Sequence, residues 1–185
     1  MRQYVALFSD ITVRKQMEDQ IRQLAFLDPL TRLPNRRMLN DRLSHAIAAS
    51  KRSGRYAAVM ALDLDNFKRI NDAHGHAAGD LLLIEVARRI TSCVREVDTV
   101  ARIGGDEFVA MLCELDTDKT QSAWHAKRIA EKVRLALSEP YWLTLNKEGQ
   151  AEFTVEHNCS ASIGVVLFVF MKKMAAPLRA HPTPV

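Results

Sequence analysis

Runs of apolar residues with little alternation mark the candidate strands of this chain. Tyr56–Leu62 is almost continuously apolar, which predicts a central strand buried on both faces. Thr99–Ile103 and Phe108–Leu112 are shorter apolar runs separated by glycines, and this pattern predicts a β-hairpin. Two further strand-like runs, near Tyr141–Leu145 and Cys159–Phe168, follow toward the C-terminus.

Apolar residues three and four positions apart mark the candidate helices. One helix is expected after Asn35, a residue type that caps helices, and two more from about Ala78 to Val94 and from about Lys119 to Leu137. The buried face of the first would carry Leu39, Leu43, Ala46 and Ile47. This order of strands and helices predicts an α/β sandwich with a mostly antiparallel central sheet flanked by helices.

A polar segment near the N-terminus carries Met17, Ile21, Leu24 and Leu27 at spacings of four, three and three. Such a narrow stripe is typical of a two-helix seam, although a terminal helix packed on its own domain has the same periodicity. Tyr4–Phe8, ahead of it, has the pattern of a short strand.

Composition and charge narrow the class of protein. The 185 residues are 48% hydrophobic, which suits one packed domain with some flanking sequence. The net charge is only +4, and the basic residues are scattered. The densest basic pairs are not interleaved with aromatic residues, so no nucleic-acid groove is expected. These pairs are Arg36-Arg37, Arg88-Arg89 and Lys172-Lys173.

The cysteines and the apolar runs bear on the compartment. The three cysteines lie far apart without metal-ligand spacing, as expected of unpaired thiols in a reducing cytoplasm. The longest apolar run, Ile163–Met171, is too short to cross a bilayer, and the N-terminus lacks the features of a signal peptide. We therefore expect a cytoplasmic chain, with any membrane segment belonging to a longer parent protein.

The candidate chemistry lies at the hairpin. Gly104 and Gly105 leave the backbone bare where Asp106 and Glu107 follow, and bare N–H groups beside carboxylates suit a metal-bound phosphate. An ordinary hairpin turn with solvated charges is the alternative. A second acidic strand end at Asp63 favours the functional interpretation, because ligands bind where buried strands end in α/β proteins.

The stretch Arg102–Phe108 resembles the signature of the GGDEF family, the diguanylate cyclases. The stretches Asp28–Arg37 and Asp63–Asp72 are also similar to that family, and the similarity extends from about Asp28 to Leu167. The resemblance implies a palm-like fold shared with nucleotide cyclases and polymerases. It also implies the condensation of two GTP molecules into cyclic di-GMP, with release of two pyrophosphates.

The resemblance implies roles for the acidic residues. Asp63, the backbone carbonyl of Leu64 and Asp106 would hold Mg²⁺, two ions per site, with Mn²⁺ as an alternative ion. Asp106 would also accept the proton of the attacking hydroxyl. Glu107 would either bind metal or position the turn.

Further roles concern the nucleotide. Lys68 resembles a lysine that stabilises the transition state, and His76 a histidine that contacts the substrate, with a structural role in a glycine-flanked turn as the alternative. Asn71 and Asp80 resemble the residues that contact guanine. A carboxylate and a carboxamide can pair with the N1–H and N2–H₂ groups of guanine, and adenine would leave those acceptors unpaired.

The segment Arg95-Glu96-Val97-Asp98 matches the position of the family's product-inhibition site, where Arg95 and Asp98 would bind cyclic di-GMP. Alone, this pattern is typical of a solvated helix end.

The resemblance also suggests a domain organisation. Residues 1–14 look like the C-terminal end of a PAS sensor, 15–27 like its signalling linker, and 28–168 like a GGDEF domain that lacks the family's last helix. The non-matching tail, 169–185, contains Pro177, Pro182 and Pro184, which would interrupt such a helix. We therefore expect a truncated or frame-shifted product of a longer parent, active only as a homodimer. A non-catalytic module that binds cyclic di-GMP or GTP, or a poorly folded fragment, are the alternatives.

Overall fold

The computed structural model describes residues 25–146 and 152–169. The predicted sensor remnant with its strand over 4–8, the linker ahead of residue 25 and the tail from 170 onward lie outside these ranges. The described elements are α2 (Arg36–Ser53), β1 (Ala57–Leu64), α3 (Phe67–His74), α4 (His76–Cys93), β2 (Thr99–Gly104), β3 (Glu107–Leu112), α5 (Lys119–Ser138), β4 (Tyr141–Leu145), β5 (Phe153–His157) and β6 (Ala161–Phe168).

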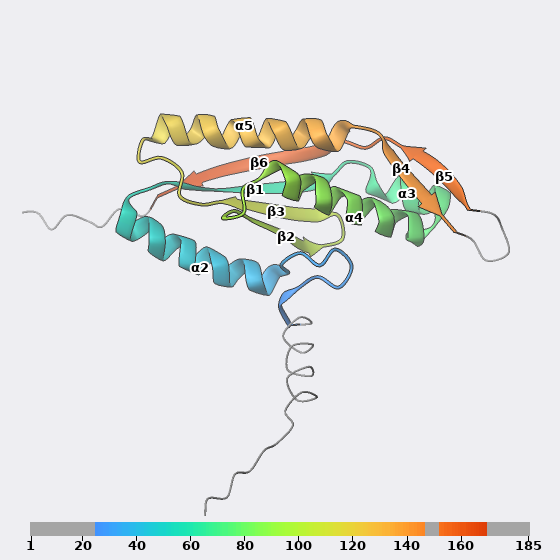
Figure 1. Cartoon of the computed structure of the whole chain (residues 1–185), viewed down its shortest axis with the longest axis horizontal. Coiled ribbons are helices and arrows are strands. Elements are labelled where there is room, and N and C mark those ends of the chain that lie inside the picture. The colour runs from blue at the N-terminus through green and yellow to red at the C-terminus, as the bar shows by residue number, and fades with distance from the viewer. Residues whose placement is uncertain (1–24, 147–151, 170–185) are drawn as a thin grey trace, which may run out of the picture.

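A four-stranded antiparallel sheet in the order β2-β3-β1-β6 forms the centre of the molecule. Helices α4 and α5 pack on it, and their buried side chains join those of the strands in one core. Helix α2 packs on β2 over a smaller cluster formed by Leu39, Ala101 and Met111. Figure 1 shows the strands lying between α5 and α2. The predicted palm-like α/β sandwich is therefore confirmed.

Strand β1 is central, but the prediction that both of its faces are buried is wrong for its second half. Met60 and Leu62 are buried in the core, whereas Ala61 and Asp63 are exposed. Successive side chains of a strand point to opposite faces, so one face is open at this end. The strand also continues to Leu64, beyond the predicted end. The open face is the one on which the acidic residues lie.

The three predicted helices are confirmed, with small shifts at their ends. Asn35 caps α2 as predicted, and its side-chain oxygen accepts two backbone N–H groups of the first turn. The helix expected from about Ala78 begins at His76. Helix α3 was not predicted, because Phe67 and Ile70 are the only large apolar side chains among its eight residues.

The helical stripe predicted up to Leu27 ends before that residue. Leu27 lies in an isolated antiparallel bridge with Pro34. The side-chain amide of Asn35 donates to the carbonyl oxygen of Ala25 at 3.1 Å, which ties the two arms of this turn together. Pro29 disfavours helical backbone in the residue before it, so the chain leaves the helix here.

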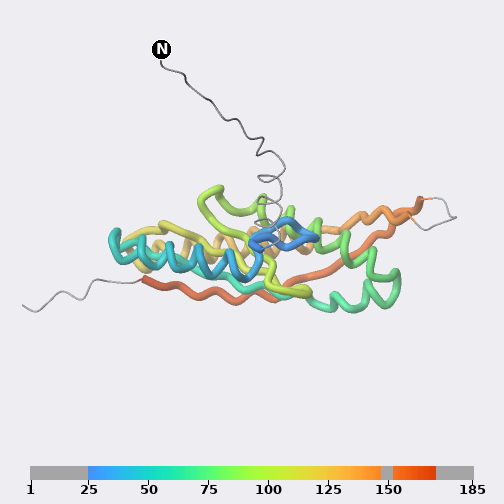
Figure 2. The backbone as a smooth tube through the Cα atoms, turned by 90° about the horizontal axis from the view of Figure 1, so that it is seen from below, coloured from blue at the N-terminus to red at the C-terminus, as the bar shows by residue number. Residues whose placement is uncertain are grey.

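Strands β4 and β5 form a separate two-stranded antiparallel sheet. β4 has the predicted bounds, whereas β5 was missed because its side chains are mostly exposed and give little apolar signal. Figures 1 and 2 place this hairpin at one end of the molecule, at the same end as α3. The last predicted strand begins at Ala161 rather than Cys159.

Strand β6 forms one edge of the main sheet and pairs only with β1 among the described strands. Its eight residues include no charged side chain, and 66% of Val166 is exposed. The opposite edge, at β2, is partly covered, because the Arg102 N–H donates to the carbonyl oxygen of Pro34 at 3.0 Å. The two edges of the sheet therefore differ in how much backbone they leave open.

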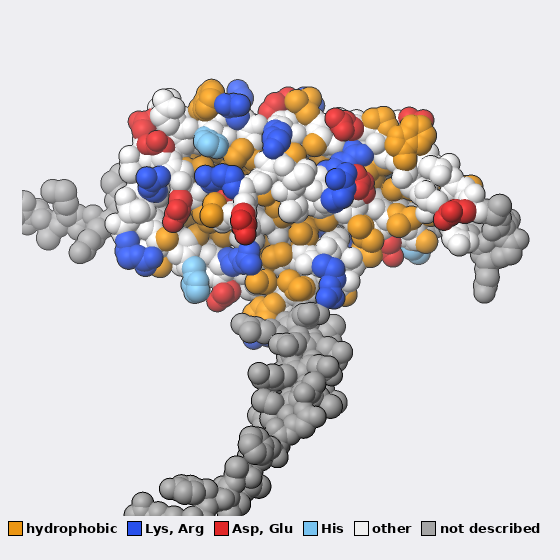
Figure 3. All heavy atoms as spheres, viewed as in Figure 1, with side chains coloured by type: hydrophobic (Ala, Val, Ile, Leu, Met, Phe, Trp, Pro, Cys, Tyr) orange, Lys and Arg blue, Asp and Glu red, His pale blue; other side chains and the backbone are white. Residues whose placement is uncertain are grey.

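The surface of the described part is mixed in character. On the face seen in Figure 3, basic side chains are interspersed with acidic and apolar ones. No helix within residues 25–146 and 152–169 has both the length and the apolar character of a membrane span. Cys93, Cys113 and Cys159 are unpaired thiols, as the sequence predicts.

Arg89 ties α4 to the end of α5 and the start of β4. Its guanidinium lies 3.8 Å from the centroid of the Tyr141 ring, and its Nε donates to Glu85 at 3.0 Å. Only 12% of the Arg89 side chain is exposed, so these contacts are shielded from water. Three further hydrogen bonds of 2.7–2.9 Å run to the carbonyl oxygens of Ala136, Glu139 and Pro140.

We expect Arg89→Met to lower the free energy of unfolding by about 1–3 kcal/mol, because the largely buried guanidinium makes hydrogen bonds to three carbonyl groups and to Glu85 that methionine cannot replace. Arg88→Met is the matched control: that side chain is 68% exposed and, within the described residues, pairs with Glu85 alone, so its loss should change stability by at most about 0.5 kcal/mol. Urea unfolding followed by circular dichroism measures both variants. Equal effects would contradict the role assigned to Arg89.

Candidate active site

The register of the sheet places the two acidic segments of the sequence side by side. Asp63 on β1 lies directly opposite Glu107 on β3. Residues directly opposite on antiparallel strands share a face, so both side chains lie on the open face of the sheet. Asp106, half-buried at the hairpin tip, lies close enough to Asp63 for their charges to interact. The predicted carboxylate pair is therefore brought together.

The hairpin turn depends on its glycines. Gly104 and Gly105 have φ angles of 156° and 51°, which residues with a side chain rarely adopt. Apart from the adjoining residues, no described atom lies within 4 Å of the position that a Cβ would take at either glycine, so the turn is open to a ligand. A register shift between Arg102 and Gly104 breaks the ladder just before the turn.

Arg102 holds this turn in place. Its Nε and Nη2 donate to the carbonyl oxygen of Gly105 at 2.9 and 2.7 Å, and its Nη1 donates to Asp28 at 3.1 Å. Asp28 also accepts the N–H and the hydroxyl of Thr31. Burial acts to raise the pKa of the Asp28 carboxyl, but the hydrogen bonds from Thr31 and Arg102 outweigh it, so the pKa lies below 3.8. The N-terminal turn thereby fixes the glycine turn.

This positioning pair was missed by the sequence analysis. Asp28 lies 74 residues from Arg102, and no local pattern joins them. The available signal was an arginine just ahead of the glycine turn. Its candidate partner was Asp28, the acidic residue of the stretch 28–37 that resembles the GGDEF family.

The electrostatics of Asp63 suit a cation. Loss of hydration raises the pKa of its carboxyl above 3.8, and the negative charges of Asp106, Glu107 and Asp65 raise it further. Within the described residues, no group of three or more His, Cys, Asp or Glu side chains forms a complete metal site. One or two carboxylates completed by substrate phosphates are nevertheless what Mg²⁺ prefers, so the donor set fits this ion.

Helices α3 and α4 carry the predicted nucleotide-binding residues. Lys68 and Asn71 lie on α3, exposed His76 begins α4, and Asp80 follows one turn later. A methyl group at Gly79 would overlap the side-chain amide of Asn71, so the two helices touch here. The predicted guanine-contacting residues, Asn71 and Asp80, therefore lie on adjoining surfaces.

The second predicted site, Arg95 and Asp98, is a preformed ion pair. The Asp98 side chain is fully buried, and it accepts the backbone N–H, Nε and Nη2 of Arg95 at 3.0–3.1 Å. It also accepts the N–H of Cys113 at 3.0 Å. A solvated helix end therefore does not describe Asp98. The Arg95 side chain remains 44% exposed, so it is the member of the pair that faces solvent.

Comparison with known proteins decides the family. A sequence profile described as diguanylate cyclase, GGDEF domain, matches residues 25–172. This chain belongs to the GGDEF domain family.

The GGDEF domain is similar to parts of much longer proteins. It is 46% identical over 146 residues to the bifunctional diguanylate cyclase/cyclic di-GMP phosphodiesterase MucR of Pseudomonas aeruginosa, across 79% of this chain and 19% of MucR. It is 36% identical over 159 residues to the cyclic di-GMP phosphodiesterase PdeR of Escherichia coli, across 86% of this chain and 22% of PdeR. The chain thus spans about a fifth of these relatives.

Solved structures agree with the GGDEF fold. A truncated TpbB of Pseudomonas aeruginosa comprising only the GGDEF domain is 40% identical, with a TM-score of 0.66 over 77% of this chain and 75% of that one. The coiled coil and GGDEF domain of DgcB from Caulobacter crescentus, in complex with cyclic di-GMP, is 25% identical. Its TM-score is 0.69 over 86% of this chain and 78% of DgcB.

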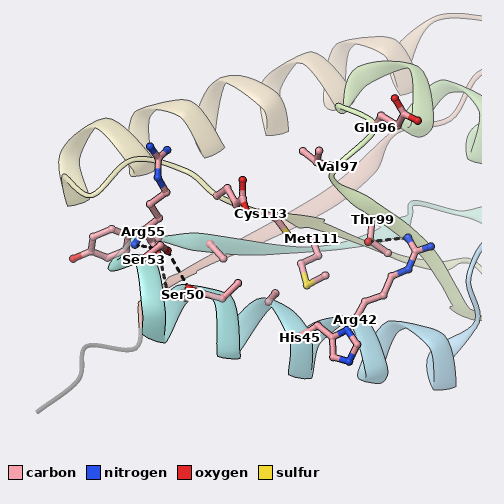
Figure 4. A pocket seen from close by; sticks show the side chains of 15 residues that line it. Arg42, His45, Ser50, Ser53, Arg55, Glu96, Val97, Thr99, Met111 and Cys113 are labelled. Atoms are coloured by element: carbon pink, nitrogen blue, oxygen red, sulfur yellow. Dashed lines mark hydrogen bonds between the residues drawn. The ribbon is translucent and has the colours of Figure 1, made fainter.

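A cavity of about 460 Å³ lies between α2 and strands β2 and β3 of the GGDEF domain (Figure 4). Met111 and Cys113 lie along it, Arg55 lies at one end, and Arg42 at the other donates to the Thr99 hydroxyl at 3.1 Å. It is lined by none of the predicted catalytic or product-binding residues. The cavity is therefore separate from the carboxylate cluster.

We expect Asp63→Asn to leave the melting temperature of the metal-free domain unchanged or slightly higher, because it removes a repelled charge. Between pH 3.8 and the raised pKa of Asp63, the folded state holds more protons than the unfolded state. The contribution of the Asp63 carboxyl to the free energy of unfolding therefore falls as the pH rises through that window. Stabilisation by Mg²⁺ should be lost in the variant. Thermal melts with and without Mg²⁺ measure both effects.

Asp41→Asn, at an exposed position on α2, is the control for the same chemical change. It should keep the full response to Mg²⁺. An Asp63→Asn variant that melts below the parent and still responds to Mg²⁺ would show that Asp63 is structural.

Proposed function

We propose that this chain is the catalytic module of a diguanylate cyclase, which condenses two GTP molecules into cyclic di-GMP. The observation that carries the proposal is the meeting of Asp63 with Asp106 and Glu107 on the open face of the sheet. The glycine turn beside them is open, and α3 and α4 present further polar residues. Membership of the GGDEF family supports the same reaction.

The chemistry required is the joining of a 3′-hydroxyl to an α-phosphorus. The hydroxyl oxygen bonds to phosphorus, the bond from phosphorus to pyrophosphate breaks, and the hydroxyl proton passes to Asp106, with Glu107 as the neighbouring acceptor. A second identical step closes the ring and releases the second pyrophosphate. The bare backbone at Gly104 and Gly105 would let phosphate oxygens approach.

Mg²⁺, held by Asp63, the Leu64 carbonyl and Asp106, would neutralise phosphate charge and lower the pKa of the hydroxyl. Lys68 would add a positive charge to the phosphates. Its side chain makes no hydrogen bond or ion pair within the described residues, and neither does that of Asp80. Both are therefore available to a ligand.

Each chain would bind one GTP, so turnover requires two chains facing each other. The proposed dimer would form through the segment that carries Met17, Ile21 and Leu24, with the open faces of the two sheets opposed. A homodimer also explains why the site is so exposed in one chain, since the partner would supply the other half of the reacting pair.

Incubation with GTP and Mg²⁺, followed by chromatography, tests the proposal. The expected products are cyclic di-GMP and two pyrophosphates per dinucleotide. The protein must be freed of carried-over product and shown by light scattering to be dimeric. Under those conditions, the absence of product would rule out the cyclase.

A second candidate is a non-catalytic module that binds cyclic di-GMP. The preformed Arg95–Asp98 pair favours it, as does a cavity of about 350 Å³ that Arg95 lines with Trp124 and Arg128. Trp124 is 55% exposed, and the Arg128 guanidinium lies over its ring at 4.7 Å from the centroid, so an aromatic ring and a second arginine both lie beside Arg95. Calorimetry with each nucleotide separates the candidates. Dinucleotide binding without GTP binding would favour the second.

We expect Asp80→Ala to weaken GTP binding by about 1–3 kcal/mol, because the base loses acceptors for its N–H groups. Binding of Mg²⁺ should change little, since Asp63 and Asp106 are untouched. Asp41→Ala provides the matched control. Calorimetry with GTP, and separately with Mg²⁺, measures both. An equal loss of metal and nucleotide affinity would mean that Asp80 is structural.

We expect Arg95→Ala to lose cyclic di-GMP affinity while keeping the GTP affinity of the parent, because Arg95 is the exposed member of its pair. In an active dimer the initial rate should stay near that of the parent, and the progress curve should no longer flatten as product accumulates.

The control is Arg36→Ala, which removes an exposed arginine from α2. Because Asp98 would lose donors in Arg95→Ala, a thermal melt must show that the variant is folded. Arg95→Lys keeps the charge without the planar fork and should show intermediate affinity. Unchanged dinucleotide binding in Arg95→Ala would remove Arg95 from the product site.

A further inference from the structure

A polar cavity of about 640 Å³ lies where α3 meets the end of α5 and the segment between β5 and β6. Figures 1 and 2 show α3 and the β4–β5 hairpin together at this end of the molecule. Asp65 and Asn66, which follow directly after β1, line part of the cavity. It is lined by none of the residues proposed to bind GTP, metal or product.

Basic side chains converge on this cavity from two elements. Arg69 and His74 come from α3, and His157 from the end of β5. Within residues 25–146 and 152–169, none of these three side chains forms an ion pair or a hydrogen bond. This differs from the other arginine clusters of the domain, such as Arg88 and Arg89, which are paired with Glu85.

The one acidic residue on the cavity wall is already engaged. Asp65 accepts the hydroxyl of Ser160 at 2.6 Å and that of Ser162 at 2.8 Å. Both carboxylate oxygens of Asp65 are thus directed to the serines. It forms no salt bridge with the basic residues of the cavity, which leaves their charges uncompensated.

The basic groups of the cavity lie close enough for their charges to repel one another. Burial lowers the pKa of His157, and the positive charges of His74 and Arg69 lower it further. Like charges that are held together in a partly buried cavity favour an anion, which would relieve their repulsion. An arginine fork and two imidazole N–H groups are donors that match phosphate oxygens.

We propose that this cavity binds a phosphate-bearing anion through Arg69, His74 and His157. A di- or polyphosphate suits the three basic groups better than a single carboxylate, because it offers several charged oxygens at once. The site is independent of the proposed cyclase reaction. Since α3 carries Lys68 and Asn71, an anion held against its other side would also restrain the helix that bears these two residues.

The test uses the full chain, with inorganic pyrophosphate as the probe and EDTA present to prevent metal-dependent binding at the carboxylates. NMR of the histidine C2–H signals reports where the probe binds, since the chain has six histidines. The His74 and His157 signals should shift saturably, while those of His45 and His125 should not. Shifts confined to His76, or no shift at millimolar pyrophosphate, would overturn the proposal.

Variants make the assignment independent of the spectra. Arg69→Gln and His157→Gln should each weaken pyrophosphate binding by about three- to tenfold, since each removes one basic donor. Arg88→Gln removes the same charge from an exposed position elsewhere and should leave the affinity unchanged. Equal weakening in all three variants would indicate only non-specific attraction to the chain, and would also overturn the proposal.

The pH dependence has a defined sign. The titratable and charged groups that line the cavity are Asp65, Arg69, His74, His157 and Cys159. A bound anion should raise the pKa of His157 toward or above its ordinary value, so binding takes up protons and weakens as pH rises through the histidine range. Affinity independent of pH between about 5 and 8 would contradict a role for the histidines.

Discussion

The register between β1 and β3 is the constraint on which the site depends. Because side chains alternate along a strand, a slip of β1 by one residue would turn Asp63 toward the core and away from Glu107. The register is fixed by the buried face of the same strands, where Met60, Leu62 and Phe108 pack in the core. Apolar packing on one face thus determines the distance between carboxylates on the other.

Two arginines join segments that lie far apart in the sequence. Arg102 links the N-terminal turn at Asp28 to the carbonyl of Gly105, and Arg89 links α4 to the end of α5 and β4. Both side chains are 12% exposed, so their hydrogen bonds are largely shielded from water. The glycine turn could not be both open to a ligand and fixed in position without such a brace, because glycine itself supplies no side-chain contacts.

Much of the fold could be predicted because its strands and long helices carry strong apolar patterns. The hairpin, the Asn35 cap and helices α2, α4 and α5 follow from spacing alone. Helix α3 and strand β5 could not be found this way, because the apolar face of α3 consists of Phe67 and Ile70 alone and the side chains of β5 are mostly exposed. The exposed second face of β1 was missed for a related reason. A run of small apolar residues does not show at which residue the elements that cover that face end.

The residues of the candidate site also fall into those that the sequence could predict and those that it could not. Asp63, Asp106 and the glycines could be proposed from the sequence because carboxylates and glycines at strand ends form a local pattern. The Asp28–Arg102 pair and the burial of Asp98 depend on contacts between distant segments, and no periodicity records them. The cationic cavity behind α3 is of this kind as well, since His157 is 83 residues (157 − 74) from its partner His74.

The two edges of the sheet differ in how readily another strand could pair with them, and the uncharged edge is at β6. At the β2 edge, a backbone N–H is already taken by the N-terminal turn, so an added strand would compete with an existing contact. At β6 no second strand pairs on the outer side within the described residues, and the strand itself carries no lysine or glutamate that would repel an approaching backbone. Any extension of this sheet, whether by another segment of a longer parent or by unwanted association at high concentration, would therefore begin at β6.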